Sequence, residues 1–428
     1  MYGINARAVC ASCKLTDEWR LRLVCACGAA VGSQLSQGRP EEAALCAKVL
    51  GQLVTAADVG AAPALLALVP PLLESLQALE DGDPLLGPLS ASLLGVVRAL
   101  GESHYAQLWG GEGGREGVAC ALSVLRRLLL GPTFPADWAV MRALANHVAL
   151  GALQELAQLL ASRFLRPLDV PLWLQYLRLA SDFLAQPSLQ LEHLSPTQRA
   201  RLTERYGDMR LLAGFQVLAL WGRLWEEEGG RCELVSSLVG PLVRMTLVRE
   251  AELRRAMLPL FYDLMDKDLP KVESELMEQL DELVTAGSGD EQYQQLFTSI
   301  RMILLSALSL RKARRALRCI LSLHYSIINT LCRSVMEGAE NRDKRMSCTV
   351  NLLRFYREEV GRQEMFVRYV HKLCELHVPA EHFAEAAIAL RLHADLLPWE
   401  EGEQGRLKEQ LYLNMLHYFD RGKASFSA

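Results

Sequence analysis

The sequence predicts an all-α protein, built as an irregular α-solenoid of antiparallel helix pairs. Three observations predict this class. Apolar residues recur with the period of a helix almost throughout, whereas the alternation typical of strands is nearly absent. Turn residues interrupt the pattern at short intervals, for example at 81–88, 166–171 and 285–291. Aromatic residues make up only 7% of the chain and leucine is abundant, which favours packed helices over sheets.

Helices of about 10–20 residues with short breaks are typical of stacked pairs, in the manner of armadillo or HEAT repeats. We expect irregular repeats because the sequence shows no strict period. A single globular helical bundle is the alternative that the same pattern allows.

Two segments illustrate the expected helices. Residues 40–57 begin with Pro40 and two acidic residues, which are typical of a helix start, and Leu45, Val49 and Leu53 form an apolar stripe. Residues 136–165 are longer and more apolar, as expected for a helix that is buried on more than one side.

The last predicted helix covers residues 407–421. Its apolar stripe repeats every four residues, and Gly422 follows as the expected C-cap. We expect helices 366–395 and 407–421 to expose apolar faces, which a dimer mate or further helices would cover. The stripe that could form such a face consists of Leu407, Leu411, Met415 and Phe419.

Composition argues against several classes of function. The net charge of −4 provides no general attraction to nucleic acid or anionic lipid. The most apolar run, 59–73, is too short to span a membrane and contains three prolines. No signal peptide is recognisable at the N-terminus. The eleven cysteines fall mostly in helical patterns, as Cys46 and Cys374 do, which predicts reduced thiols and a cytoplasmic protein.

Two short motifs could carry chemistry, and we interpret both as structural. The glycine-rich stretch 110–117 lacks the spacing of a phosphate-binding loop, because Glu116 occupies the position of the last glycine, so a flexible surface loop is expected. Cys10, Cys13, Cys25 and Cys27 could in principle hold zinc. The C-x-C half is an awkward ligand pair within an apolar helical pattern, so core cysteines are favoured.

Five of the nine histidines lie in the last 60 residues, but none forms the metal-binding H-E-x-x-H pattern or an i, i+4 pair. No nucleophile elbow, Walker loop or kinase motif is present. The sequence therefore predicts no catalytic, cofactor-binding or metal-binding residues, and no cofactor. The histidines are His371, His377, His382, His393 and His417.

A basic cluster at 310–318 has two interpretations. Its arginines share one helix face and could bind acidic lipid headgroups or an acidic partner. A solvated face neutralised by nearby acidic residues is favoured instead, and nucleic acid is disfavoured because stacking aromatic residues are missing. The cluster consists of Arg311, Lys312, Arg314, Arg315 and Arg318.

Several ordered stretches from about residue 165 onward resemble the dedicator-of-cytokinesis family, cytosolic activators of Rho-type GTPases. They include "PLWLQYLRLASDFLAQPSLQLEHLS" (171–195), "RYGDMR" (205–210), "RMSCTVNLLRFYRE" (345–358) and "FVRYVHKLCELHVPAEHFAEAAIALRLHADLLPW" (366–399). The last is similar to the start of the family's catalytic DOCKER region. The similarity is to the Rac-directed branches.

The resemblance implies an armadillo-like array over 1–355, in which 1–164 matches only loosely, and the first DOCKER lobe over 356–428. In the family this lobe supports dimers, whereas two later lobes bind the GTPase and displace its magnesium. Residues 424–428 depart from the family pattern, so we expect a fragment or truncated isoform that cannot catalyse exchange alone; an incomplete gene model is another possibility.

The resemblance thus implies a scaffold or dimerisation part of a Rho/Rac guanine-nucleotide exchange factor, in small-GTPase signalling to the actin cytoskeleton. Its implied partners are a Rho-family GTPase through the full-length protein, a family dimer mate and an adaptor, with membrane contact only by recruitment. The alternative is a non-enzymatic helical protein that binds or competes with full-length family members.

Overall fold

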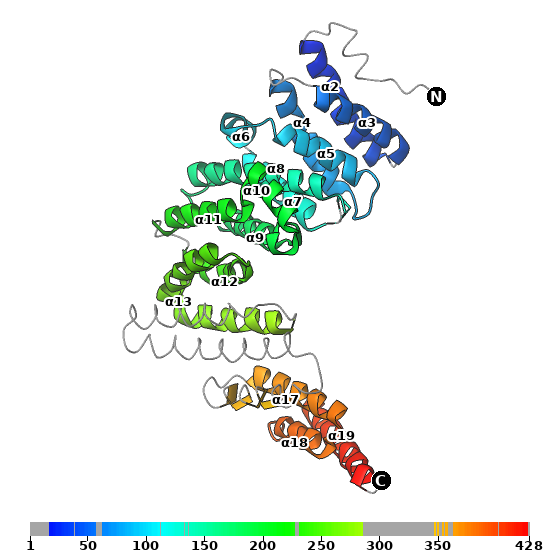
Figure 1. Cartoon of the computed structure of the whole chain (residues 1–428), viewed down its shortest axis with the longest axis vertical. Helices are drawn as coiled ribbons and strands as arrows, with labels where there is room; N and C mark the ends of the chain where they lie inside the picture. The colour runs from blue at the N-terminus through cyan, green and yellow to red at the C-terminus, as the bar shows by residue number, and fades with distance from the viewer. Residues whose placement is uncertain are drawn as a thin grey trace. The chain divides into compact units, whose positions relative to one another are not determined.

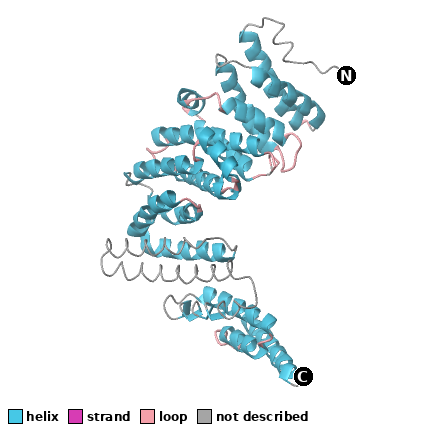
Figure 2. Cartoon of the chain, viewed as in Figure 1, coloured by secondary structure: helices cyan, strands magenta, loops and turns pink. Residues whose placement is uncertain are grey.

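The computed structural model describes most of the chain, and every regular element in the described residues is a helix (Figure 2). The predicted all-α class is confirmed. The described residues are 17–37, 39–56, 62–111, 113–131, 133–135, 137–226, 231–285, 363–400 and 402–426, with eight further residues between 346 and 357.

The chain divides into two compact units, Met1–Phe261 and Tyr262–Ala428. In unit 1 the described helices follow one another along the chain with short connections (Figure 1). They are α2 (Asp17–Ser36), α3 (Pro40–Ala56), α4 (Ala62–Ala78), α5 (Leu86–Val97), α6 (Glu102–Trp109), α7 (Gly114–Leu130), α8 (Ala139–Arg163), α9 (Val170–Ala185), α10 (Pro196–Tyr206), α11 (Met209–Glu226), α12 (Arg231–Leu247) and the start of α13 (Ala251–Thr285).

Unit 1 is a two-layered helical stack. One layer consists of α2, α4, α7, α9 and α12, each packed against the next, and the other consists of α3, α5, α8 and α11. The layers pair as α2 with α3, α4 with α5, α7 with α8 and α9 with α11. Leu253 of α13 reaches Gly214 of α11 and so continues the second layer. This is the arrangement of an α-solenoid rather than that of a single bundle.

Two short helices interrupt the regular pairing, which explains why no fixed repeat is visible in the sequence. Helix α6 lies between α5 and α7 in the chain and packs against α7 and α8. Helix α10 separates α9 from α11, and two 3₁₀ turns, Pro187–Leu189 and Leu191–His193, precede it. Ser195 caps α10 by accepting a hydrogen bond from the backbone N–H of Gln198.

Burial within unit 1 confirms the prediction for α8 and contradicts part of the prediction for α3. Helix α8 is buried around most of its circumference, as its apolar sequence predicted. In α3 the predicted stripe is wrong at Leu45, which is 61% exposed while Ala43, Ala47 and Leu50 are buried. Val49 is half-buried, and the side chain of Leu53 lies outside the described residues. The small alanines allow α3 to approach its neighbours closely, so close packing rather than side-chain size selects the buried face.

The glycine-rich stretch 110–117 is not the long surface loop that the sequence predicted. Helix α6 ends at Trp109 and α7 begins at Gly114, so the connection is a tight turn in which Gly113 adopts a left-handed φ of 80°. Gly117 lies inside α7, where a β-carbon would come 2.5 Å from the indole of Trp109. The glycines therefore make room for a buried tryptophan.

Ion pairs join helices of one layer. Asp182 of α9 is 93% buried and accepts hydrogen bonds from Arg126 Nε of α7 at 2.6 Å and from Arg244 Nη1 of α12 at 3.1 Å. Near the other end of α7, Arg115 pairs with Asp169, which caps the start of α9. Because start pairs with start and end with end, α7 and α9 run parallel, as alternate helices of a solenoid do.

Trp173 and Arg210, which lie in the segments 171–195 and 205–210 singled out in the sequence, help to join the helices of this stack. The indole N–H of Trp173 donates to the carbonyl of Phe164 at the end of α8, at 2.9 Å. Arg210 is buried and donates to both carboxylate oxygens of Glu192 and to Asp208. Asp208 in turn accepts from the backbone N–H of Arg210 at the start of α11. These side chains fix how successive helices meet.

Unit 2 contains the second part of α13 and the helices α17 (Gln363–His377), α18 (Phe383–Ala394) and α19 (Glu403–Phe426). Helix α13 is interrupted at Asp268, whose carboxylate accepts from the backbone N–H of Lys271 and restarts the helix. Helix α18 packs against both α17 and α19. The core of this unit also includes Met346, Leu353 and Tyr356.

The predicted C-cap at Gly422 is wrong, because α19 continues to Phe426. Gly422 instead lies where α19 passes close to the first turn of α18. A β-carbon there would lie 3.6 Å from Cβ of Phe383. A glycine that permits a close helix crossing and a glycine that ends a helix look the same in the sequence.

Candidate functional site

No group of histidine, cysteine and acidic residues that could hold a metal ion occurs within the described part of the chain. Of the predicted cysteine cluster, Cys10 and Cys13 lie outside the described residues. Cys25 and Cys27 lie in helix α2, and Cys27 is a free thiol. Burial, and to a smaller extent the nearby Cys46, raises the pKa of the Cys27 thiol, which favours its protonated form.

The basic cluster at 310–318, with Arg311, Arg314, Arg315 and Arg318, lies outside the described residues. Among the helices that are described, none combines the length and apolarity needed to cross a membrane.

The stripe predicted on the last helix is partly inside the protein. Leu411 and Met415 are buried in the core of unit 2, so they do not form an exposed face. Leu407 and Phe419 are more than one third exposed. The exposed leucines of α19 lie elsewhere on its circumference, at Leu413 and Leu416, which are 58% and 59% exposed.

These two leucines are three residues apart on a helix and therefore share one face. Ile388 of α18 and Trp399 in the α18–α19 connection are also exposed. Trp399 lies against Tyr412 of α19, with ring centroids 5.4 Å apart. We call Leu413, Leu416 and Phe419, which follow one another three residues apart on α19, the unit 2 apolar surface.

A buried lysine holds the α18–α19 connection in place. Lys408 Nζ donates to the carbonyl of Leu397 at 2.7 Å and lies 4.8 Å from the ring centroid of Trp399. The ammonium thus satisfies a carbonyl beyond the end of α18 and adds a cation–π contact. Trp399 is therefore held against the protein even though its outer face contacts solvent.

The histidines that the sequence left without a role meet in pairs. His371 Nε2 of α17 and His393 Nδ1 of α18 are 3.0 Å apart, so one ring donates a hydrogen bond to the other. Burial lowers the pKa of His393, and the neighbouring His371 lowers it further. Burial likewise lowers the pKa of His377, which lies beside His382. For His377 and His393 the lowered pKa favours the neutral ring.

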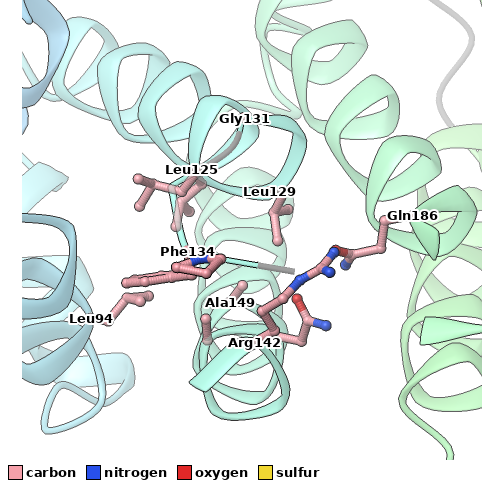
Figure 3. A pocket seen from close by; sticks show the side chains of 12 residues that line it. Leu94, Leu125, Leu129, Gly131, Phe134, Arg142, Ala149 and Gln186 are labelled. Carbon is pink, nitrogen blue, oxygen red and sulfur yellow. The ribbon is translucent and has the colours of Figure 1, made fainter. Parts of the chain in front are cut away.

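A cavity in unit 1 was not predicted by any motif. It has a volume of about 230 Å³ and lies between α5, α7 and α8, beside Gln186 at the end of α9. Figure 3 shows Leu94, Leu125 and Phe134 toward one end of the cavity and Arg142 and Gln186 at the other. The leucines that line the cavity follow the same helical periodicity as core leucines. Only its polar lining residues, Arg142, Asn146 and Gln186, could therefore have indicated it in the sequence.

The family model described as "Dedicator of cytokinesis (DOCK) TPR region" matches residues 32–300. This match includes most of 1–164, which the sequence motifs had related only loosely to the rest. It also agrees with the structure, in which helices α2–α12 form one continuous stack.

Curated relatives match over most of this chain. Dedicator of cytokinesis protein 3 from Homo sapiens is 32% identical over 368 residues, and dedicator of cytokinesis protein 4 from Homo sapiens is 34% identical over 361 residues. Each match covers 79% of this chain and 18% of the relative. Among solved structures, a circular tandem repeat protein with novel repeat topology matches over 99% of this chain and 100% of its own chain, with a TM-score of 0.39 and 14% identity.

The family region, the two relatives and the helical stack agree with one another. The chain belongs to the dedicator of cytokinesis family.

Proposed function

We propose that this chain is the non-catalytic helical scaffold of a Rho/Rac guanine-nucleotide exchange factor, acting in small-GTPase signalling to the actin cytoskeleton. The observation that carries the proposal is the match of residues 32–300 to the family's TPR region. A stack whose neighbouring helices are joined by buried ion pairs suits a scaffold, because it holds bound partners at fixed separations.

The partners follow from the family. A Rho-family GTPase is reached through the full-length exchange factor, an adaptor binds the scaffold, and the membrane is reached only by recruitment from the cytoplasm. No nucleic acid or cofactor takes part. We also propose that residues 356–428 correspond to the first lobe of the DOCKER region, which supports dimers in the family.

The proposal is tested by the release of a fluorescent GDP analogue from Rac. We expect the chain alone to leave the release rate unchanged at micromolar concentration, while an intact family member accelerates it in the same assay. Clear acceleration by the chain alone would show that it is itself an exchange factor.

The second candidate function is binding to another family member, and it is favoured by the unit 2 apolar surface. Exposed apolar side chains that lie side by side on one helix face are typical of a surface that a partner covers. We propose that the same lobe of a second family chain covers Leu413 and Leu416.

Light scattering after size exclusion should then show dimers, which the double variant Leu413→Asp/Leu416→Asp would abolish. Leu45→Asp is the matched control, because Leu45 is an equally exposed helical leucine in unit 1. A monomer at all concentrations, with no binding to an intact family member, would exclude this function.

A further inference from the structure

Helix α10 takes no part in either layer of unit 1. None of its residues is buried, and it makes few contacts with the other described helices, whereas α9 and α11 on either side of it pack directly against each other. The ring of Tyr206 in its last turn lies against that of His147 of α8, with centroids 4.9 Å apart. Because unwinding α10 exposes no core residue, we expect it to open locally more easily than the helices of the two layers.

The residue before this helix, Ser195, is the only serine or threonine of the chain that is followed by proline. Residues 195–201 are all exposed. The Ser195 hydroxyl forms its hydrogen bonds within the same turn, donating to Gln198 Oε1 at 3.0 Å and lying 3.3 Å from Thr197 Oγ1. No contact with another helix of the described stack therefore covers this hydroxyl.

A serine followed by proline in an exposed segment is the substrate form of one class of protein kinase. Such a kinase binds extended chain and offers no acceptor to the backbone position after the serine, so proline, which has no N–H, fits there. Leu194 and Ser195 already have extended backbones, with φ/ψ of −93°/150° and −61°/152°. Only the first turns of α10 have to unwind for a kinase to bind, and they carry no buried residue.

We propose that Ser195 is a phosphorylation site for a proline-directed protein kinase that uses ATP. Ser195 Oγ attacks the γ-phosphorus of ATP, the bond from that phosphorus to the β–γ bridging oxygen breaks, and ADP leaves. The hydroxyl proton passes to the catalytic carboxylate of the kinase. The proposal is independent of dimerisation and of any role in nucleotide exchange.

The phosphate would act on the order of α10. Ser195 Oγ now accepts a hydrogen bond from the backbone N–H of Gln198 at 3.4 Å, which makes it the cap of the helix. A phosphate adds a charge of about −1.5 to −2 and further acceptor oxygens at this position. Arg199, one turn on, donates to the Leu191 carbonyl and lies on the same side of the chain as the new charge. Phosphorylation should therefore hold α10 in its helical form once the kinase has released it.

The site is tested by phosphorylating the whole chain with ATP and a mitogen-activated protein kinase, and separately with a cyclin-dependent kinase. We expect phosphate at Ser195, located by fragment mass spectrometry, with kcat/KM within about tenfold of that for a synthetic peptide of residues 186–203. Ser195→Ala should abolish the incorporation, and Pro196→Ala should lower kcat/KM about tenfold or more. Thr197→Ala is the matched control, because this exposed hydroxyl has no proline after it.

Hydrogen exchange measures the effect on the helix. The α10 amides of the phosphorylated chain should exchange about two- to fivefold more slowly than those of the unmodified chain, while the α8 amides should not change. Ser195→Ala, which has no cap, should exchange faster in α10. In cultured animal cells that produce the chain, serum stimulation with phosphatase inhibitors should place phosphate on the tryptic peptide that ends at Arg199.

The proposal is overturned if neither kinase modifies the peptide or the chain, or if the peptide is modified while the folded chain reacts more than about 100-fold more slowly. Incorporation that persists in Ser195→Ala would place the site elsewhere. Unmodified Ser195 in stimulated cells, measured in the same tryptic peptide, would also overturn it.

Discussion

Replacing Asp182 by asparagine tests whether the buried ion pairs hold the helical stack together. The substitution keeps the size of the side chain, removes its charge and turns an amide N–H toward one of the two arginines. The carboxylate that is lost is 7% exposed and joins α9 to both α7 and α12. We therefore expect Asp182→Asn to loosen three consecutive helices of one layer.

The magnitude follows from the two hydrogen bonds. A hydrogen bond to a charged group contributes about 1.5–3 kcal/mol. Arg126 and Arg244 are 47% and 50% exposed, so water replaces part of what they lose and the lower end applies to each. The free energy of unfolding of unit 1 should fall by about 2–3 kcal/mol, which corresponds to a Tm lower by roughly 5–10 °C.

Thermal melting and urea titration measure this loss, and Asp81→Asn is the control. Asp81 pairs at 2.8 Å with Arg127, which lies in α7 next to Arg126, but the Asp81 carboxylate is 70% exposed. Its loss should cost less than about 1 kcal/mol. A double-mutant cycle with Arg126→Met isolates the coupling to Asp182. If Asp182→Asn melts at the native temperature, the buried carboxylate does not stabilise the stack and the reasoning is refuted.

Three further predictions concern unit 2. Leu411→Asp places a charge in the core and should cost several kcal/mol, making 363–426 sensitive to protease, whereas the exposed Leu413→Asp should not. Gly422→Ala should stabilise α19 by about 0.5–1 kcal/mol in urea titration, because the new β-carbon makes an ordinary contact; a loss would restore the C-cap interpretation. Burial lowers the pKa of His393 in the folded state, so below about pH 6.5 the unfolded chain binds protons more readily and stability falls as the pH falls. The protection of the α17 and α18 amides against hydrogen exchange, corrected for intrinsic exchange rates, should therefore be lower at pH 5.5 than above pH 6.5. The difference should shrink in a variant that carries both His371→Gln and His393→Gln. Equal protection at the two pH values would contradict the prediction.

The sequence predicted the helices well because helical periodicity is a local property. It predicted which face is buried less well, because burial depends on which helices pack alongside. In α3 the exposed Leu45 was predicted to be inside, and in α19 the buried Leu411 was predicted to face outward. Both helices have apolar residues on more than one face, so periodicity alone could not choose between them.

Glycine was the least predictable residue, since its role depends on what approaches it. Gly422 allows α19 to pass close to α18, and Gly117 makes room for the indole of Trp109. The cavity was missed for a related reason. Its polar end joins Arg142 of α8 to Gln186 after α9, and no short motif connects residues so far apart in the chain.

The two-layered stack of unit 1 has a mechanical consequence. Each helix mainly contacts helices close to it along the stack, so any change of angle at one joint is added to those of the joints that follow. A slight rotation where Asp182 joins α7, α9 and α12 would therefore move the helices before this joint relative to those after it. The contacts of a single buried carboxylate would then limit how far the two ends of the stack can turn relative to one another.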